Sequence, residues 1–178
     1  RVVSSEGNPV YSARVAVDAE ENVIWGGAVN GTVSLGGADI PSVTALSSFL
    51  ARFDAEGNHL WSELYCSNCQ VIELAADEDG AAIVTGLFTQ STFFDPAEEA
   101  VLAVGSVDVF MGKVAIDQSY VWTKTIGSHS IENVESVGVT CDGDIVGTFV
   151  FYGAVNVDDE AVVPGTAVIK FTGDGDHL

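Results

Sequence analysis

Basic residues are scarce in this chain. Its 178 residues include 6 Lys and Arg against 26 Asp and Glu, which gives a formal net charge of -20. Nucleic-acid binding needs clustered cations that displace the counterions of the phosphates, so this composition excludes a nucleic-acid partner. The same shortage disfavours anionic membrane surfaces, and no run of about 18 apolar residues predicts a membrane-spanning helix. We therefore expect neither nucleic-acid binding nor membrane insertion.

Strong helix formers are also few, and helical periodicity is nearly absent. Short runs of β-branched and aromatic residues recur instead, bounded by Gly, Asn and Asp. An apolar fraction of 47% is too high for a disordered acidic segment, and the chain is long enough to bury one core. The sequence predicts a single all-β domain or segment over residues 1–178.

One pattern occurs three times. Residues 48–61 (SFLARFDAEGNHLW) predict a strand, a tight turn and a second strand that opens on tryptophan. The pattern returns at residues 109–122 (VFMGKVAIDQSYVW) and 168–178 (VIKFTGDGDHL), and the strands before each copy also match. We assign repeat units to approximately residues 13–65, 72–126 and 135–178. Four short antiparallel strands per unit of about 60 residues are typical of the blades of a β-propeller.

The repeat also resembles the bacterial SBBP-type β-propeller repeat. The resemblance lies in Ala16-Val17-Asp18, the V-x-x-G strand at 23–26, G-T-V-x-x-G-G at 31–37 and F-x-A-R-F-D-x-x-G-N-x-L-W at 49–61. The second copy lacks the Gly-Gly and has Phe94-Asp95-Pro96 there, and the third has Thr140 where the others have Asp. The resemblance implies a propeller fold in a secreted or cell-surface protein, and it implies no single activity.

Three blades do not close a propeller, which usually has about four to eight. The third copy stops at His177-Leu178, where the others continue into tryptophan, and residues 1–5 precede the first strand. We expect residues 1–5 to form the outer strand of another blade. The remaining blades would come from the same parent chain or from a second copy.

Propeller topology places the long connections on one face and the tight hairpins on the other. The connections at 30–47, 89–107 and 152–166 would share that face with Cys66–Val71 and Gly127–Glu135, and exposed loops on a rigid scaffold commonly bind ligands. We therefore expect a glycan or protein ligand there. The candidate ligand residues on this face are Asn30, Asp39, Asp95, Glu98, Asp158 and Asp159.

The hairpins collect many carboxylates, which makes calcium the candidate ion. Oxygen-rich turns suit hard cations, and the candidate ligands are Asp77, Asp79, Asp174 and Asp176. Neither turn has the full spacing of a calcium loop. The alternative is that Asp, Asn and Gly serve the turns themselves, because tight hairpins need residues that tolerate positive φ and cap backbone N–H groups. No other cofactor is predicted.

Cys66 and Cys69 form a C-x-x-C pair, which fits half of a zinc site, a redox pair or a local disulfide. The extracellular setting implied by the resemblance favours the disulfide. Cys141 would then remain as a free, partly buried thiol.

Two further sets of residues recur at matching positions. Trp61 and Trp122 begin equivalent strands, and we interpret them as packing between units. Arg52, Lys113 and Lys170 also share one position, and we expect each to pair with a carboxylate of its own or an adjacent unit.

Nothing in the sequence assembles a catalytic centre. The three histidines, His59, His129 and His177, fall in unrelated segments, and no G-x-S-x-G, H-E-x-x-H or phosphate-loop motif occurs. The leading hypothesis is a non-catalytic extracellular module for binding, adhesion or protein–protein interaction. The alternatives are a polysaccharide hydrolase or lyase of propeller fold and a purely structural spacer.

Overall fold

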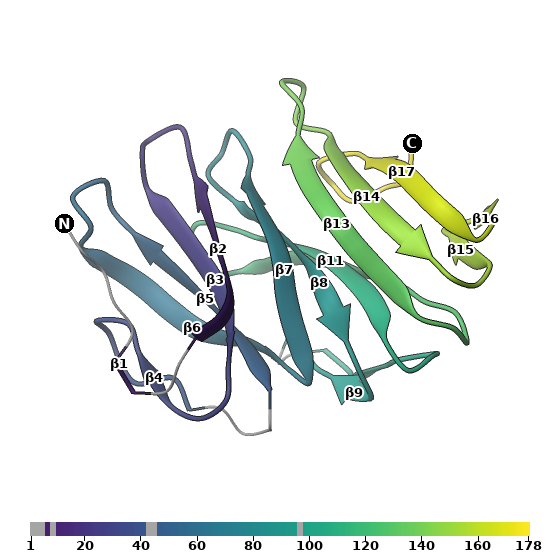
Figure 1. Cartoon of the computed structure of the whole chain (residues 1–178). Helices are drawn as coiled ribbons and strands as arrows, with labels where there is room; N and C mark the ends of the chain where they lie inside the picture. Colours follow the sequence, from purple (N-terminus) through teal and green to yellow (C-terminus); the bar gives the residue numbers. More distant parts are fainter. Residues whose placement is uncertain (1–5, 8–9, 42–45, 96–97) are drawn as a thin grey trace.

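The computed structural model describes residues 6–7, 10–41, 46–95 and 98–178, and within these ranges the chain forms strands and no helix (Figure 1). The prediction of an all-β protein is confirmed. The strands are β1 (Glu6–Gly7), β2 (Val10–Val17), β3 (Val23–Val29), β4 (Val33–Ser34), β5 (Ser47–Phe53), β6 (His59–Ser67), β7 (Cys69–Ala76), β8 (Ala82–Phe88), β9 (Ser91–Thr92), β10 (Val101–Leu102), β11 (Asp108–Val114), β12 (Tyr120–Ile126), β13 (Glu132–Val139), β14 (Ile145–Phe151), β15 (Val155–Val157), β16 (Glu160–Val162) and β17 (Gly165–Phe171).

Three antiparallel sheets follow one another along the chain. The first sheet has the order β2-β3-β5-β6, the second β7-β8-β11-β12 and the third β13-β14-β17. The first strands β2, β7 and β13 are neighbours across the sheet boundaries. Figure 1 shows the three sheets side by side in chain order. Three two-stranded sheets accompany them: β1-β4, which pairs strands distant in the chain, and the hairpins β9-β10 and β15-β16.

Two expected connections are shorter than predicted, because β6 and β7 take up nearly all of Cys66–Val71, and β13 begins at Glu132 within Gly127–Glu135. Residues 66–71 were expected to form a connection, yet Cys66 belongs to β6 and Cys69 to β7, so that Asn68 alone separates the two strands. Asn68 has a φ of 56°, which turns the chain sharply enough to start the next sheet at once. The predicted outer strand at residues 1–5 lies outside the described residues.

The six tight turns share one backbone geometry. In each, the N–H of the first residue donates to the carbonyl of the fifth, and the N–H of the fourth donates to the carbonyl of the first, at 2.8–3.1 Å. The fourth residue always has a positive φ. These turns occupy residues 18–22, 54–58, 77–81, 115–119, 140–144 and 172–176.

The side chain of the first turn residue explains why Asp recurs there. The Asp18 and Asp77 carboxylates accept the N–H groups of the third and fifth turn residues, at 2.8–3.1 Å. In the third sheet, the Thr140 and Thr172 hydroxyls accept the fifth N–H at 3.1 Å. Thr140 therefore replaces Asp without loss of the turn, because a hydroxyl oxygen can accept the same bond.

Three hydrophobic clusters lie on the faces of the sheets. Between the first and second sheets, Leu50 packs in one cluster with Phe110; between the second and third, Met111 packs with Phe149. The third cluster covers the other face of the first sheet, around Phe49. The long connections contribute to all three, through Phe94, through Val155 and Val157, and through Val33, Leu35 and Ile40.

The turn geometry makes a prediction at Gln118, which has a φ of 72° where four of the other five turns have glycine. A left-handed conformation costs an L-residue about 1–2 kcal/mol, against about 0.4–1 kcal/mol for the extra unfolded-state freedom of glycine. Gln118→Gly should therefore raise the free energy of unfolding by about 0.5–1 kcal/mol, measured by urea denaturation.

The matched control is Gly143→Gln at the same turn position of the third sheet. Its φ is 83°, and an added Cβ would have no other atom within 4 Å, so the backbone conformation alone decides the outcome. This variant should be destabilised by a similar amount. A destabilised Gln118→Gly would contradict the common turn geometry.

Candidate functional site

The recurring cation of β5, β11 and β17 pairs with a carboxylate in the first turn of its own sheet. Lys113 pairs with Asp77 at 2.8 Å and Lys170 with Asp144 at 2.6 Å, and Arg52 pairs with Asp18. The expected pairing is confirmed in all three sheets.

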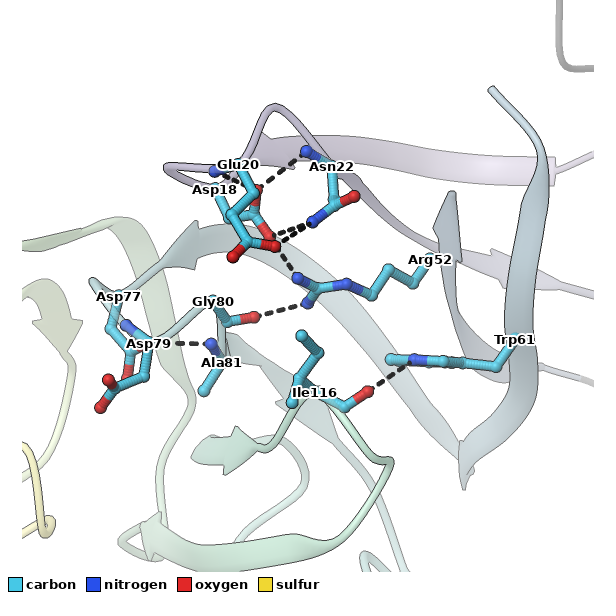
Figure 2. A network of polar contacts seen from close by, with 10 residues as sticks. All are labelled: Asp18, Glu20, Asn22, Arg52, Trp61, Asp77, Asp79, Gly80, Ala81 and Ile116. Carbon is cyan, nitrogen blue, oxygen red and sulfur yellow. Dashed lines mark hydrogen bonds and ion pairs between the residues drawn. The ribbon is translucent and has the colours of Figure 1, made fainter. Parts of the chain in front are cut away.

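Arg52 also reaches the next sheet (Figure 2). Its side chain is buried, with 1% of the residue exposed, and Nη1 donates to the Gly80 carbonyl in the first turn of the second sheet at 2.5 Å. Burial acts to raise the pKa of Asp18, but hydrogen bonds from Asn22 and Glu20 and the charge of Arg52 outweigh it and lower the pKa. Both partners therefore stay charged, and a buried ion pair links two turns of different sheets.

The tryptophans make a second contact between sheets. Trp61 Nε1 donates to the Ile116 carbonyl at 3.0 Å, and Trp122 Nε1 donates to the Gly173 carbonyl at 3.1 Å. Both acceptors are the second residue of the second turn in the following sheet. The interpretation of these tryptophans as packing between units is confirmed.

Each tryptophan stands directly opposite the recurring cation. Arg52 is the cross-strand partner of Trp61, and Lys113 is that of Trp122. We call each such couple, Arg52 with Trp61 and Lys113 with Trp122, a cation–tryptophan pair. The pair is a repeated device that attaches one sheet to the turns of the next.

The six predicted ligand residues differ in their exposure. Asn30, Asp39, Glu98 and Asp159 are exposed, whereas Asp95 is half-buried. Asp158 is held by Lys124 of the second sheet at 2.9 Å and accepts the N–H of His177 at 3.2 Å.

The position of Asp158 corrects the expectation for the third connection. His177 directly follows the tight turn at 172–176, so the β15-β16 hairpin returns along the sheet towards the turns. The hydrogen bond from Lys124 is the main reason why the pKa of Asp158 is lowered. This carboxylate is already engaged in a contact between the second and third sheets.

The four candidate calcium ligands lie at their turns, and calcium binding stays a prediction. Asp77 caps its own turn and pairs with Lys113, while Asp79, Asp174 and Asp176 point outward as exposed turn residues. In the part of the chain that the structure describes, no three His, Cys, Asp or Glu side chains gather to hold a metal ion. The carboxylates recur because they serve the turns.

Cys66 and Cys69 form a disulfide, which joins the last strand of the first sheet to the first strand of the second. Cys141 is a free thiol, as predicted, but it is exposed rather than partly buried. The reason is its place as second residue of the turn at 140–144, whose side chain points away from the sheet.

Sequence reasoning missed a buried pair of acids between the second and third sheets. Asp108 is 2% and Glu132 0% exposed. Asp108 accepts N–H groups of residues 104 and 105, and Ser128 donates to Glu132 at 2.5 Å. Burial raises the pKa of Glu132, and the adjacent Asp108 raises it further. The sequence offered one signal. Asp108 begins β11 where β5 of the first sheet begins with Ser47, and Glu132 begins β13 where β7 of the second sheet begins with Cys69.

A second perturbed acid lies between the first and second sheets. Burial raises the pKa of Glu63 to about 7, although a hydrogen bond with Tyr120 acts to lower it. Burial raises the pKa of the Tyr65 phenol beside it as well. Tyr65 stacks on Tyr120 with ring centroids 6.0 Å apart, so this acid sits in an aromatic environment.

The three histidines remain apart. His59 packs against Phe53 and shares a hydrogen bond with Ser62 at 3.0 Å, His129 is exposed, and His177 packs against Phe171. The histidines bring no base to the Asp108–Glu132 pair or to Glu63.

The outward face of the first sheet is hollowed. A cavity of about 350 Å³ opens there, between the sheet and its second turn. It is lined by Val15, Val23, Trp25, Phe53, Asp54, Ala55, Glu56 and Gly57. Trp25 is oriented by an edge-on contact with Phe49 at 5.6 Å.

No family model matches the chain, and no curated protein matches it. The resemblance to the SBBP-type repeat therefore stays a prediction. The described residues include no helix with the length and apolarity to cross a membrane.

Arg52 supports a stability prediction. Arg52→Met leaves Asp18 buried without its charge partner, and removing one side of a buried pair costs about 3–5 kcal/mol. Urea denaturation should show a loss of that size. Lys170→Met is the matched control: its pair is nearly half exposed at the lysine, so its loss should stay below about 1 kcal/mol. Equal losses would contradict the role assigned to Arg52.

Glu63 supports a prediction about pH. Its folded pKa of about 7 exceeds the ordinary value of 4.5, so the folded state binds more protons between these values and stability falls as pH rises through this window. Glu63→Gln should remove that fall, and its unfolding free energy relative to wild type should increase from pH 5 to pH 8. The exposed Glu99→Gln should show no such trend in the same urea experiments.

Proposed function

We propose that this chain is part of a non-catalytic β-propeller that acts in binding or adhesion outside the cell. The observation that carries the proposal is the cation–tryptophan pair, whose indole attaches the first sheet to the second and the second to the third at the same turn position. The cation reaches the next sheet too, although Arg52 binds the first turn there and Lys113 the second. Repetition of one sheet-to-sheet contact is typical of radially repeated blades. The further blades would come from a parent chain or a second copy.

The disulfide supports the extracellular assignment. Disulfides persist in oxidising compartments and are rare where thiols are kept reduced. The Cys66–Cys69 bond joins two sheets across a one-residue connection, so it holds the end of β6 next to the start of β7. An extracellular module is also consistent with the strongly acidic composition, which promotes solubility.

The buried and half-buried acids argue against the hydrolase or lyase. A glycoside-cleaving pair must reach both sides of a sugar bond. Asp108 and Glu132 are sealed between two sheets, and Glu63 faces tyrosines, so none of them offers a reachable acid pair. A binding role needs only the exposed residues of the long connections.

The ligand surface would use the connection residues that remain exposed, above all Asp39 and Glu98. Carboxylates on a rigid scaffold accept hydrogen bonds from sugar hydroxyls or pair with basic side chains. The ligand would therefore be a glycan or a basic protein surface.

A binding and turnover screen on the intact chain tests this proposal. We expect retention of a glycan or a basic protein without release of reducing or unsaturated ends, and Asp39→Ala with Glu98→Ala should weaken this binding at least about tenfold. The matched control is Asp174→Ala, an exposed acid of a tight turn, which should leave binding unchanged. Product release would favour the enzyme, and a screen without any ligand would favour the spacer.

A further inference from the structure

The outward face of the first sheet corresponds to the faces by which the second and third sheets pack against the sheet before them. Val15 and Val17 of β2 are 60% and 57% exposed. Val15 lines the cavity, and Val17 lies two residues further along the same strand. Leu74, which takes the place of Val15 in the second sheet, is 8% exposed. The first sheet thus exposes apolar residues at a position that the second sheet buries.

The second sheet shows what fills the equivalent space. The residues matching Val15, Val23 and Phe53 are Leu74, Ala82 and Val114, by strand position and turn register. These three lie in one buried cluster with Trp61. The walls of the cavity correspond to the residues that enclose a tryptophan from the preceding sheet.

The third sheet repeats the arrangement with Trp122. A Cβ at Gly175 would lie 2.9–3.3 Å from ring atoms of this tryptophan. Gly175 is the fourth residue of its turn, as Gly57 is in the first sheet, and Gly57 lines the cavity. Two sheets therefore hold an indole where the first sheet has an opening.

The polar groups of the cavity also match. The indole acceptors Ile116 and Gly173 are second turn residues, and the corresponding residue of the first sheet is Ala55, which lines the cavity. Two acids of the second turn, Asp54 and Glu56, line the cavity and form its acidic rim. An acidic rim complements the Arg or Lys that stands opposite each tryptophan.

We infer that this cavity receives the cation–tryptophan pair of another repeat, one built like the first and second sheets of this chain. The inference rests on the proposed function, because it requires a further blade beside the first sheet. The occupant is the hairpin of a third and a fourth strand, with the indole in the cavity, its N–H directed at the Ala55 carbonyl and its cation near the acidic rim.

The test uses the intact chain and a peptide with the sequence of residues 47–65, which holds Arg52 opposite Trp61, closed by an added disulfide between its ends. Calorimetry should show binding, and amide resonances of Val15, Val17, Ala55 and Gly57 should shift. A peptide with Trp61→Ala should bind at least about tenfold more weakly. Salt should weaken binding of the original peptide, because the cation contributes.

Two chain variants locate the site. Val15→Glu changes an exposed side chain at the cavity and should reduce peptide affinity at least about tenfold. Val168→Glu is the matched control, because Val168 is an equally accessible strand residue, 70% exposed, on the third sheet. Its affinity should equal that of the wild type.

N-acetyl-L-tryptophanamide serves as a second probe that does not depend on peptide folding. At millimolar concentration it should shift the same four amides in the wild type and not in Val15→Glu. The inference is overturned if neither probe shifts them, if the Trp61→Ala peptide binds equally, or if the shifts map to strand edges. It is also overturned if oligosaccharides occupy the cavity by stacking on Trp25.

These outcomes are separate from those of the proposed function. Ligand binding at the exposed connections with no response to the tryptophan probes would keep the binding module and remove this occupant. Peptide docking without any ligand would keep the occupant and favour a structural spacer.

Discussion

A buried guanidinium is the constraint on which the contact between the first two sheets depends. Removing a charge from water costs several kcal/mol unless its partners are well placed, and Arg52 finds them in Asp18 and the Gly80 carbonyl. Both partners sit in tight turns, so the turn geometry of two sheets must be correct at once. Gly80 cannot be replaced freely, because a Cβ there would lie 2.9 Å from the guanidinium.

The long connections take part in the contacts between adjacent sheets. Adjacent sheets meet closely at their first strands, and the side chains of the connections complete the apolar layers on the faces of the sheets. The connection of the first sheet folds in the same manner, through Val33, Leu35 and Ile40, on the face that points away from the second sheet. At its turn end this face opens into the cavity beside Trp25, which is the surface on which we propose that another repeat docks.

Sequence reasoning succeeded where a local rule repeats. The turns at Asp18, Asp54 and Asp77, the packing of Trp61 and Trp122, and the pairing of the recurring cation all depend on residues at fixed spacings. It failed where a contact joins distant residues. The acids Asp108 and Glu132 and the engagement of Asp158 by Lys124 could not be predicted, because nothing local distinguishes a buried acid from a solvated one in a chain with 26 of them.

By itself, the sequence determined the all-β character, the period of the repeat and the residues of the tight turns, since alternation and turn chemistry act over a few neighbours. The tertiary structure decided which carboxylates are buried, which connection residues remain exposed and which sheet face stays open. The difference has a physical reason. Burial and charge pairing depend on groups that a neighbouring sheet brings from far along the chain, such as the Gly80 carbonyl 28 residues from Arg52 and the Ile116 carbonyl 55 residues from Trp61. No short stretch of sequence records which neighbour arrives.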